Sequence, residues 1–182
     1  MGEEDSDERA DDTPLSMALI SEDALDALAT LGEEAPLDVM LTALNDSFTG
    51  VRRAAVRALR QLKGHVSPSV LTVALRNGDG YEREYVVEQL ELWSEPSVIP
   101  ILLSCLDDPE KDVREQAVKA MTTLSEYVVL EDILPFVEAR SSSTRSAALE
   151  LLARLKKPVP MDLLRQALID PASGYVSQPF MF

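Results

Sequence analysis

Cysteine, histidine and long apolar segments are scarce in this sequence. Its 182 residues include one cysteine and one histidine, which excludes an internal disulfide, a cysteine-based zinc site and a multi-histidine metal centre. No apolar run approaches the roughly 18–20 residues that a membrane-spanning helix needs. The start, MGEEDSDERADD, lacks the basic and apolar regions of a secretory signal. We therefore expect a soluble cytoplasmic protein with no cofactor and no contact with a membrane.

Basic residues are also scarce. The sequence contains 17 lysines and arginines and 32 acidic residues, so its formal net charge is −15. Residues 1–34 contain 12 acidic side chains and one base, so they carry −11 and the rest of the chain only −4. The run EEDSDERADD repels itself and has little to bury, so residues 1–13 are predicted to form a disordered acidic tail. This tail is either solubilising or a segment that binds a basic partner or groove. The overall charge disfavours binding to nucleic acid.

What the sequence does contain is a repeat of 31 residues. One apolar column with this interval consists of Leu44, Leu75, Leu106, Val137 and Leu168. Each unit combines two segments with apolar residues at helical spacing, joined by a short loop. Neither helix can bury its apolar face alone, so neighbouring units are expected to stack.

The same interval gives the limits of the units. A second helix is predicted to begin near Ser21, which is a plausible N-cap. Four complete units follow at about 36–64, 67–94, 97–125 and 128–156, and a last first helix at 160–170.

The segments LTALNDSFTGVRRAAVRAL and LLSCLDDPEKDVREQAVKAM resemble the HEAT repeat, and more narrowly the short HEAT-like repeat of the phycobilisome-lyase type. The resemblance implies an all-α, right-handed solenoid of about five two-helix units over residues 14–170, followed by an irregular segment, 171–182. It is specific for fold and unspecific for function, since such repeats occur in scaffolds, adaptors, assembly factors, bilin lyase subunits, a hydroxylase and a DNA-repair glycosylase.

Two polar columns lie around the loop inside each unit. The first contains Asp46, Asn77 and Asp108, and the second contains Arg52, Arg83, Arg114 and Arg145. In the families that the sequence resembles, such columns form a ladder of charge-assisted hydrogen bonds. The planar fork of an arginine suits bridging a carboxylate and free carbonyls at a helix end. A structural ladder is favoured over phosphate binding, because a binding site rarely recurs in every unit.

The second helices are the candidate binding face, because the resemblance implies that they line the concave side. Their solvent-facing positions form a basic stripe beside an acidic one. The members are Arg53, Arg57 and Arg60, then Glu84, Glu88 and Glu91, and in the next unit Lys119. One interpretation is a set of ion pairs between units, Arg53–Glu84, Arg57–Glu88 and Arg60–Glu91. The other is a bipolar surface for a partner, whose arginines could also attract the acidic tail.

Aromatic residues add two further candidates. Tyr81 and Tyr85 flank the glycine-containing loop NGDGYEREY, and Tyr85 is predicted to project from the surface as a contact residue. Trp93 falls in an apolar column and is predicted to pack in the core. The apolar end Phe180–Phe182 either folds back as a cap or docks into another subunit.

No arrangement of residues in the sequence suggests catalysis. Cys105 lies in an apolar column, which favours a buried hydrophobe over a nucleophile. The function favoured by the sequence is a non-catalytic scaffold, adaptor or assembly factor that binds a protein. The alternative is an accessory subunit of an enzyme or cofactor-attachment system, similar to a bilin lyase subunit. Nucleic-acid binding is disfavoured, because acidic residues share the columns of the basic ones.

Overall fold

The computed structural model describes residues 20–156, and this part of the chain is a stack of helices without a β-strand. The predicted acidic tail 1–13, the first helix at 160–170, the segment 171–182 and Phe180–Phe182 lie outside the described residues. The α-helices are α1 (Glu22–Ala29), α2 (Leu37–Ala43), α3 (Thr49–Gln61), α4 (Thr72–Asn77), α5 (Gly80–Trp93), α6 (Ile99–Ser104), α7 (Lys111–Thr123), α8 (Leu130–Val137) and α9 (Ser142–Leu155).

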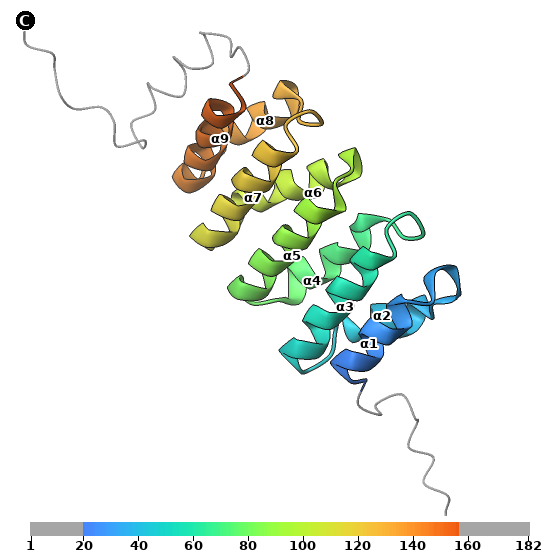
Figure 1. Cartoon of the computed structure of the whole chain (residues 1–182). Helices are drawn as coiled ribbons and strands as arrows, with labels where there is room; N and C mark the ends of the chain where they lie inside the picture. The colour runs from blue at the N-terminus through green and yellow to red at the C-terminus, as the bar shows by residue number, and fades with distance from the viewer. Residues whose placement is uncertain (1–19, 157–182) are drawn as a thin grey trace, which may run out of the picture.

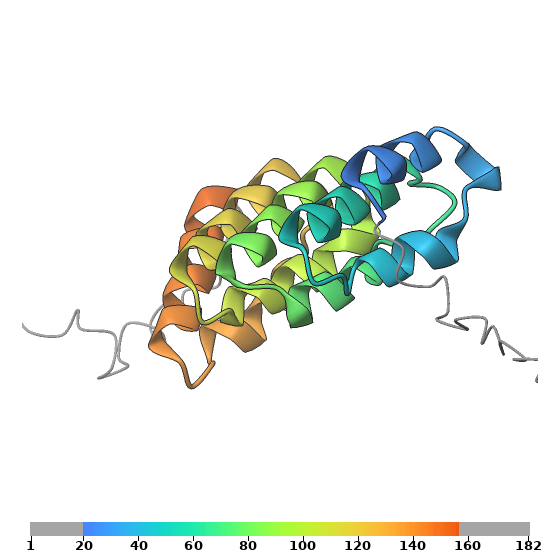
Figure 2. The same cartoon turned by 90° about the horizontal axis from the view of Figure 1, so that it is seen from below.

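The helices form two layers (Figure 1 and Figure 2). The second helices of the units, α1, α3, α5, α7 and α9, pack side by side in one layer. The first helices, α2, α4, α6 and α8, form the other layer, and each packs on the second helix that follows it. The predicted all-α solenoid is therefore confirmed, with four complete units and one preceding second helix among residues 20–156.

Side chains at the helix starts satisfy backbone N–H groups that have no partner within the helix. The Oγ atom of Ser21 accepts a hydrogen bond of 3.1 Å from the backbone N–H of Ala24, which confirms the predicted N-cap of α1. Helix α5 begins with a capping box. In it the N–H of Glu82 donates to Asp79 Oδ1 at 2.9 Å, and the N–H of Asp79 donates to Glu82 Oε2 at 3.0 Å.

Two of the first helices are preceded by a 3₁₀ turn that begins with a proline. Turn η3 (Pro68–Leu71) precedes α4, and turn η4 (Pro96–Val98) precedes α6. Proline suits the first position of a helical turn, because an N–H group at that position has no partner within the helix and proline carries none. Two more turns, η2 (Gly32–Glu34) before α2 and η5 (Cys105–Asp107) after α6, complete this layer.

The apolar columns fill the space between the layers and the units. Leu59 on α3 and Leu90 on α5 occupy one column and are both completely buried. Trp93 is also 0% exposed, which confirms its predicted place in the core. Leu31, two periods before Trp93 in the same column, is 49% exposed.

Candidate functional site on the second helices

The layer of second helices presents one row of side chains from each helix to solvent. Residues one period apart point in the same direction from neighbouring helices whose axes lie about 8–10 Å apart. Two such residues therefore meet only where a long side chain bends toward the next helix. This geometry decides which of the predicted ion pairs exist.

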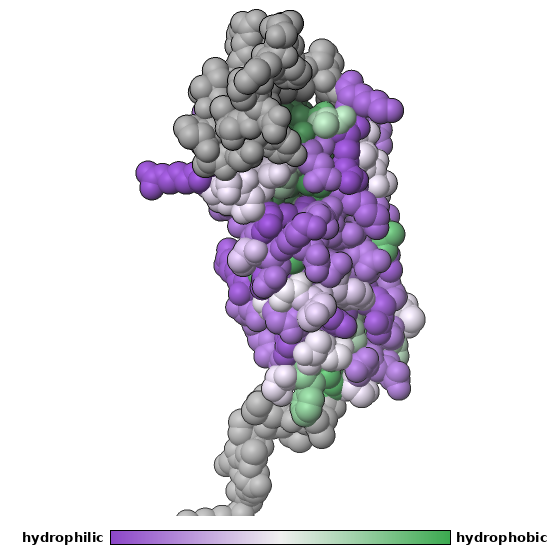
Figure 3. Space-filling view, turned by 90° about the vertical axis from the view of Figure 1, so that its left-hand side faces the viewer, coloured by the Kyte–Doolittle hydropathy of each residue, from purple (hydrophilic) through white to green (hydrophobic). Residues whose placement is uncertain are grey.

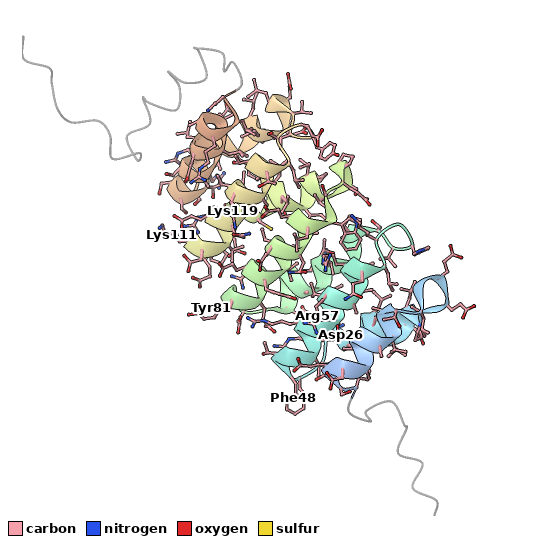
Figure 4. The ribbon with its side chains drawn as sticks, in the orientation of Figure 1. Asp26, Phe48, Arg57, Tyr81, Lys111 and Lys119 are labelled. Atoms are coloured by element: carbon pink, nitrogen blue, oxygen red, sulfur yellow. The ribbon has the colours of Figure 1, made fainter. Side chains whose placement is uncertain are left out.

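Arg57 of α3 forms its ion pair with Asp26 of α1, although Tyr85 of α5 also contributes to its raised pKa. Its Nε donates to Asp26 Oδ1 at 2.9 Å and its Nη2 donates to Asp26 Oδ2 at 2.6 Å. The hydrogen bond from Arg57 lowers the pKa of the Asp26 carboxyl, and the same bond raises the pKa of the guanidinium. The predicted pair Arg57–Glu88 is wrong, because Asp26, one period before Arg57, takes both N–H groups. Figure 4 shows Arg57 and Asp26 meeting between the two helices.

Arg53 and Arg60, the other two arginines of the predicted basic stripe, turn toward α5 but contact uncharged side chains. The Nε of Arg60 donates to Gln89 Oε1 at 2.9 Å. The guanidinium carbon of Arg53 lies 5.5 Å from the centre of the Tyr85 ring, within the range of a cation–π contact. The Arg53 Nε is buried without a hydrogen-bond partner.

The predicted pairs Arg53–Glu84 and Arg60–Glu91 are therefore also wrong. Tyr85 and Gln89 lie four residues apart and form the side of α5 that faces α3, as their contacts with the arginines show. Glu91 turns toward α7 instead. It accepts hydrogen bonds there from Gln116 Nε2 at 3.4 Å and Thr123 Oγ1 at 3.0 Å.

The outer face of α5 carries side chains that the neighbouring helices leave uncovered. Tyr81 in its first turn is 74% exposed and Leu92 near its end is 52% exposed. Glu88 is exposed and Glu84 half-buried, and neither forms an ion pair with another residue of 20–156. Tyr85, predicted to project from the surface, is only partly buried and packs against the core.

A hollow of about 400 Å³ lies where α5 and α7 begin. Its lining consists of Asp79, Gly80, Tyr81, Glu84, Glu110 and Asp112. Figure 4 shows Tyr81 and Lys111 extending at this side of the molecule from the starts of their helices. Lys111 forms an ion pair of 2.7 Å with Glu115 on its own helix, and the lining itself contains four carboxylates and no base. Seen from this side in Figure 3, the surface is mostly hydrophilic and its hydrophobic areas are small.

Lys119 is the remaining predicted contact residue. It is exposed on α7 (Figure 4) and forms no ion pair within residues 20–156. On α9 the equivalent residue is Glu150, which pairs with Arg154 at 2.6 Å. Among these second helices, α5 is the one whose outer face combines exposed large apolar side chains, Tyr81 and Leu92, with an exposed glutamate, Glu88.

The arginine column connects the two helices of each unit. Arg52 Nη1 donates to the backbone carbonyls of Asp46, at 2.6 Å, and Ser47, at 3.0 Å. The equivalent contacts at the ends of the other first helices are Arg83 to Gly78, Arg114 to Asp108 and Pro109, and Arg145 to Ala139 and Arg140. These arginines satisfy carbonyls that the helix itself leaves without partners.

The column also reaches into the next unit, though not always through the residue that the pattern predicts. Arg83 forms two hydrogen bonds with Asp108, at 2.8 and 2.9 Å. Arg52 bonds to Glu82 Oε1 with its Nε at 2.8 Å, because the position equivalent to Asp108 is Asn77, which has no carboxylate.

Asn77 instead donates to Asn45 Oδ1 at 2.7 Å. The periodic columns of the sequence do not predict Glu82 as a partner of Arg52. The D-G-x-E spacing of the capping box, Asp79 to Glu82, is the signal that places this carboxylate beside the loop.

Residues 20–156 contain no group of three or more histidine, cysteine or acidic side chains that could hold a metal ion. Burial raises the pKa of the Cys105 thiol to about 12, so at neutral pH this buried cysteine is protonated and a poor nucleophile. None of the helices in this part of the chain is both long and apolar enough to span a bilayer.

Comparison with protein families gives one result that agrees with this geometry. The model for HEAT repeats matches residues 20–91, 68–139 and 99–179 in three overlapping stretches. A search of curated proteins found no match.

Proposed function

The chain belongs to the HEAT-repeat family, and we propose that it is a non-catalytic scaffold, adaptor or assembly factor that binds another protein on the face of its second helices. HEAT repeats generally serve as protein-interaction scaffolds. The observation that carries the proposal is the outer face of α5, where exposed Tyr81 and Leu92 flank acidic residues that have no cationic partner among residues 20–156.

The stack does not need this face for its own packing. The buried columns hold the layers together, and Arg52 and Arg83 of the arginine column each connect their unit to the next. Large apolar side chains exposed in an otherwise hydrophilic surface are typical of binding surfaces. A protein partner accounts for them better than a small molecule, because the α5 face is long and open.

The 31-residue period supports a finer assignment, to the short repeats of the phycobilisome-lyase type. This assignment favours the second candidate function, an accessory subunit of an enzyme or cofactor-attachment system. Both candidates place a protein partner on the same face, and both fit a cytoplasmic protein. They differ in whether the complex performs chemistry.

Purification of the tagged full chain from its native cells, followed by mass spectrometry, tests the proposal. The variant Glu84→Lys/Glu88→Lys changes the second-helix face. The variant Glu34→Lys/Glu138→Lys is the matched control, because it makes the same change of charge at exposed residues of η2 and the end of α8. We expect a stoichiometric protein partner that the face variant loses and the control keeps.

Two results would contradict the proposal. One is the absence of any stoichiometric partner, and the other is a partner that both variants retain equally. A bound chromophore, or turnover of a tetrapyrrole by the purified complex, would favour the accessory subunit instead.

A further inference from the structure

Four residues of α5 form a stripe along the outer face of the helix, and we call Tyr81, Glu84, Glu88 and Leu92 the α5 stripe. Tyr81 and Leu92 are eleven residues apart, which is close to three full helical turns, so their side chains point in nearly the same direction. At 1.5 Å per residue they stand about 16 Å apart along the helix. The two glutamates lie between them. The stripe therefore has an apolar contact at each end and negative charge in the middle.

The stripe is peculiar to α5 among the second helices of residues 20–156. The residues equivalent to Tyr81 are Gly50 on α3, Asp112 on α7 and Ser143 on α9. The residues equivalent to Leu92 are Gln61, Thr123 and Arg154. No other described unit places a large apolar side chain at either position, although all of them stack in the same way. The fold itself therefore does not require Tyr81 and Leu92.

No base among residues 20–156 forms an ion pair with the two glutamates of the stripe. On the α3 side, Arg53 lies on the Tyr85 ring and Arg60 bonds to Gln89. On the α7 side, Lys111 pairs with Glu115. Lys119, one period after Glu88, is exposed and forms no ion pair within residues 20–156. Glu110 and Asp112 add further negative charge around the hollow that Tyr81 lines. A cationic group that docks here gains attraction without displacing an existing ion pair.

Resting on the proposed function, we infer that the α5 stripe is the docking site for a basic amphipathic helix of the partner protein. Such a helix lays its own apolar residues, spaced at i and i+11, against Tyr81 and Leu92 and places lysines or arginines opposite Glu84 and Glu88. The docking of an amphipathic helix through its apolar face is a recurrent mode of peptide recognition, and α3 and α7 pack on either side of the helix that carries the stripe. Nucleic acid and anionic lipid do not fit, because their phosphates would be repelled by the same glutamates.

A synthetic peptide tests the recognition chemistry directly. The probe is a labelled helical peptide with two leucines eleven residues apart and lysines facing the same side between them. Its binding to the full chain is followed by fluorescence anisotropy. We expect Tyr81→Ser and Leu92→Ser each to weaken binding roughly tenfold, since apolar anchors dominate such contacts. Glu88→Lys should weaken it by a similar factor, with a loss of salt dependence.

Phe48→Ser is the matched control, because Phe48 is a 60% exposed aromatic residue in the loop before α3 and outside the stripe. It should leave the affinity unchanged, and circular dichroism should show that every variant folds. The inference is overturned if the peptide does not bind, if a peptide with glutamates in place of the lysines binds equally well, or if Phe48→Ser weakens binding as much as Leu92→Ser. If a peptide whose helix is interrupted by proline binds as tightly as the helical peptide, the inference that the ligand binds as a helix is wrong.

Photo-crosslinking separates this inference from the proposed function. A photoreactive residue replaces Glu88 in the full chain, and a second chain carries it at Glu138 as the control. In native cells, we expect position 88 to crosslink to a lysine- or arginine-rich helix of the partner. If the partner binds stoichiometrically but crosslinks only elsewhere, the docking site is wrong and the scaffold function stands. If no partner binds, the proposed function itself is wrong.

Discussion

Helices α3 and α5 are neighbours whose buried faces carry equivalent apolar residues. Their solvent-facing sides differ in charge and in how many of their side chains contact a neighbouring helix. Their inward columns match, with Leu59 and Leu90 both fully buried. On the outer face, the arginines of α3 are each engaged, by Asp26, by Gln89 and by the ring of Tyr85. The outer face of α5 is instead left to solvent. The difference shows that a repeat fixes the inward residues of every unit, while the outward residues are free to differ and to serve binding.

The largest effect is expected where the two helices agree. Leu59→Ala and Leu90→Ala should each lower the free energy of unfolding by about 2–5 kcal/mol, because each removes a fully buried side chain and leaves a cavity. Urea denaturation followed by circular dichroism measures both losses. A large loss for one variant and a negligible one for the other would show that the two inner faces are not equivalent.

The arginine column should give the next largest effect, and again a similar one on both helices. Arg52→Ala removes the contact with buried Glu82, and Arg83→Ala removes the two hydrogen bonds with Asp108. Each variant leaves a poorly solvated carboxylate without its partner, so we expect a loss of about 2–3 kcal/mol in the free energy of unfolding.

Arg83→Lys is the control for charge, since it keeps the cation and loses the planar fork. It should recover only part of the stability in the same denaturation measurement. Full recovery would mean that charge alone, and not the paired hydrogen bonds, stabilises the contact.

The outer face of α3 should contribute a smaller effect. Arg57 and Asp26 are both more than a third exposed, so solvent screens their attraction. A double-mutant cycle with Arg57→Ala and Asp26→Ala should give a coupling energy of about 0.2–1 kcal/mol. The equivalent residue on α5, Glu88, should show no coupling to Arg57, and a measurable value there would restore the predicted pair Arg57–Glu88.

The pH dependence of this coupling follows from the lowered pKa of Asp26. Arg57 lowers it in the folded state below its ordinary value of 3.8, so the unfolded chain binds the proton more readily. The stabilising contribution is therefore complete above the ordinary pKa and is lost as the pH falls through the lower pKa of the folded state. The coupling energy measured by the cycle should be constant near neutral pH and decline below about pH 4. A coupling that does not decline as the pH falls below about 4 would contradict the assignment.

The sequence predicted the inward residues well and the outward contacts badly, for a physical reason. A period of 31 residues repeats the burial pattern of Leu59 and Leu90, so the columns, the layers and even the N-cap Ser21 followed from it. Contacts between exposed side chains depend on which way a flexible side chain turns. Arg57 turns back to Asp26, and Arg52 reaches Glu82, because in each case a carboxylate with good geometry is within reach. Spacing alone does not distinguish these partners from Glu88 or Asn77.

The site candidates show the same division. Sequence identified Tyr81 and the glutamates as candidate contacts but gave no reason to include Leu92. Its place at the end of α5 looks like one more apolar residue of an amphipathic helix. Only its exposure of 52%, on the same side as Tyr81, makes it part of a surface.

The claim that the outer face of α5 serves binding and not folding is tested most directly by measuring both properties on one variant. Tyr81→Ser/Leu92→Ser should leave the free energy of unfolding within about 0.5 kcal/mol of the natural protein, since both side chains are exposed, and should abolish capture of the native partner. Arg57→Ala should lower the stability slightly and leave capture intact. If the α5 variant unfolds more easily by several kcal/mol, or if it still captures the partner, the account is contradicted.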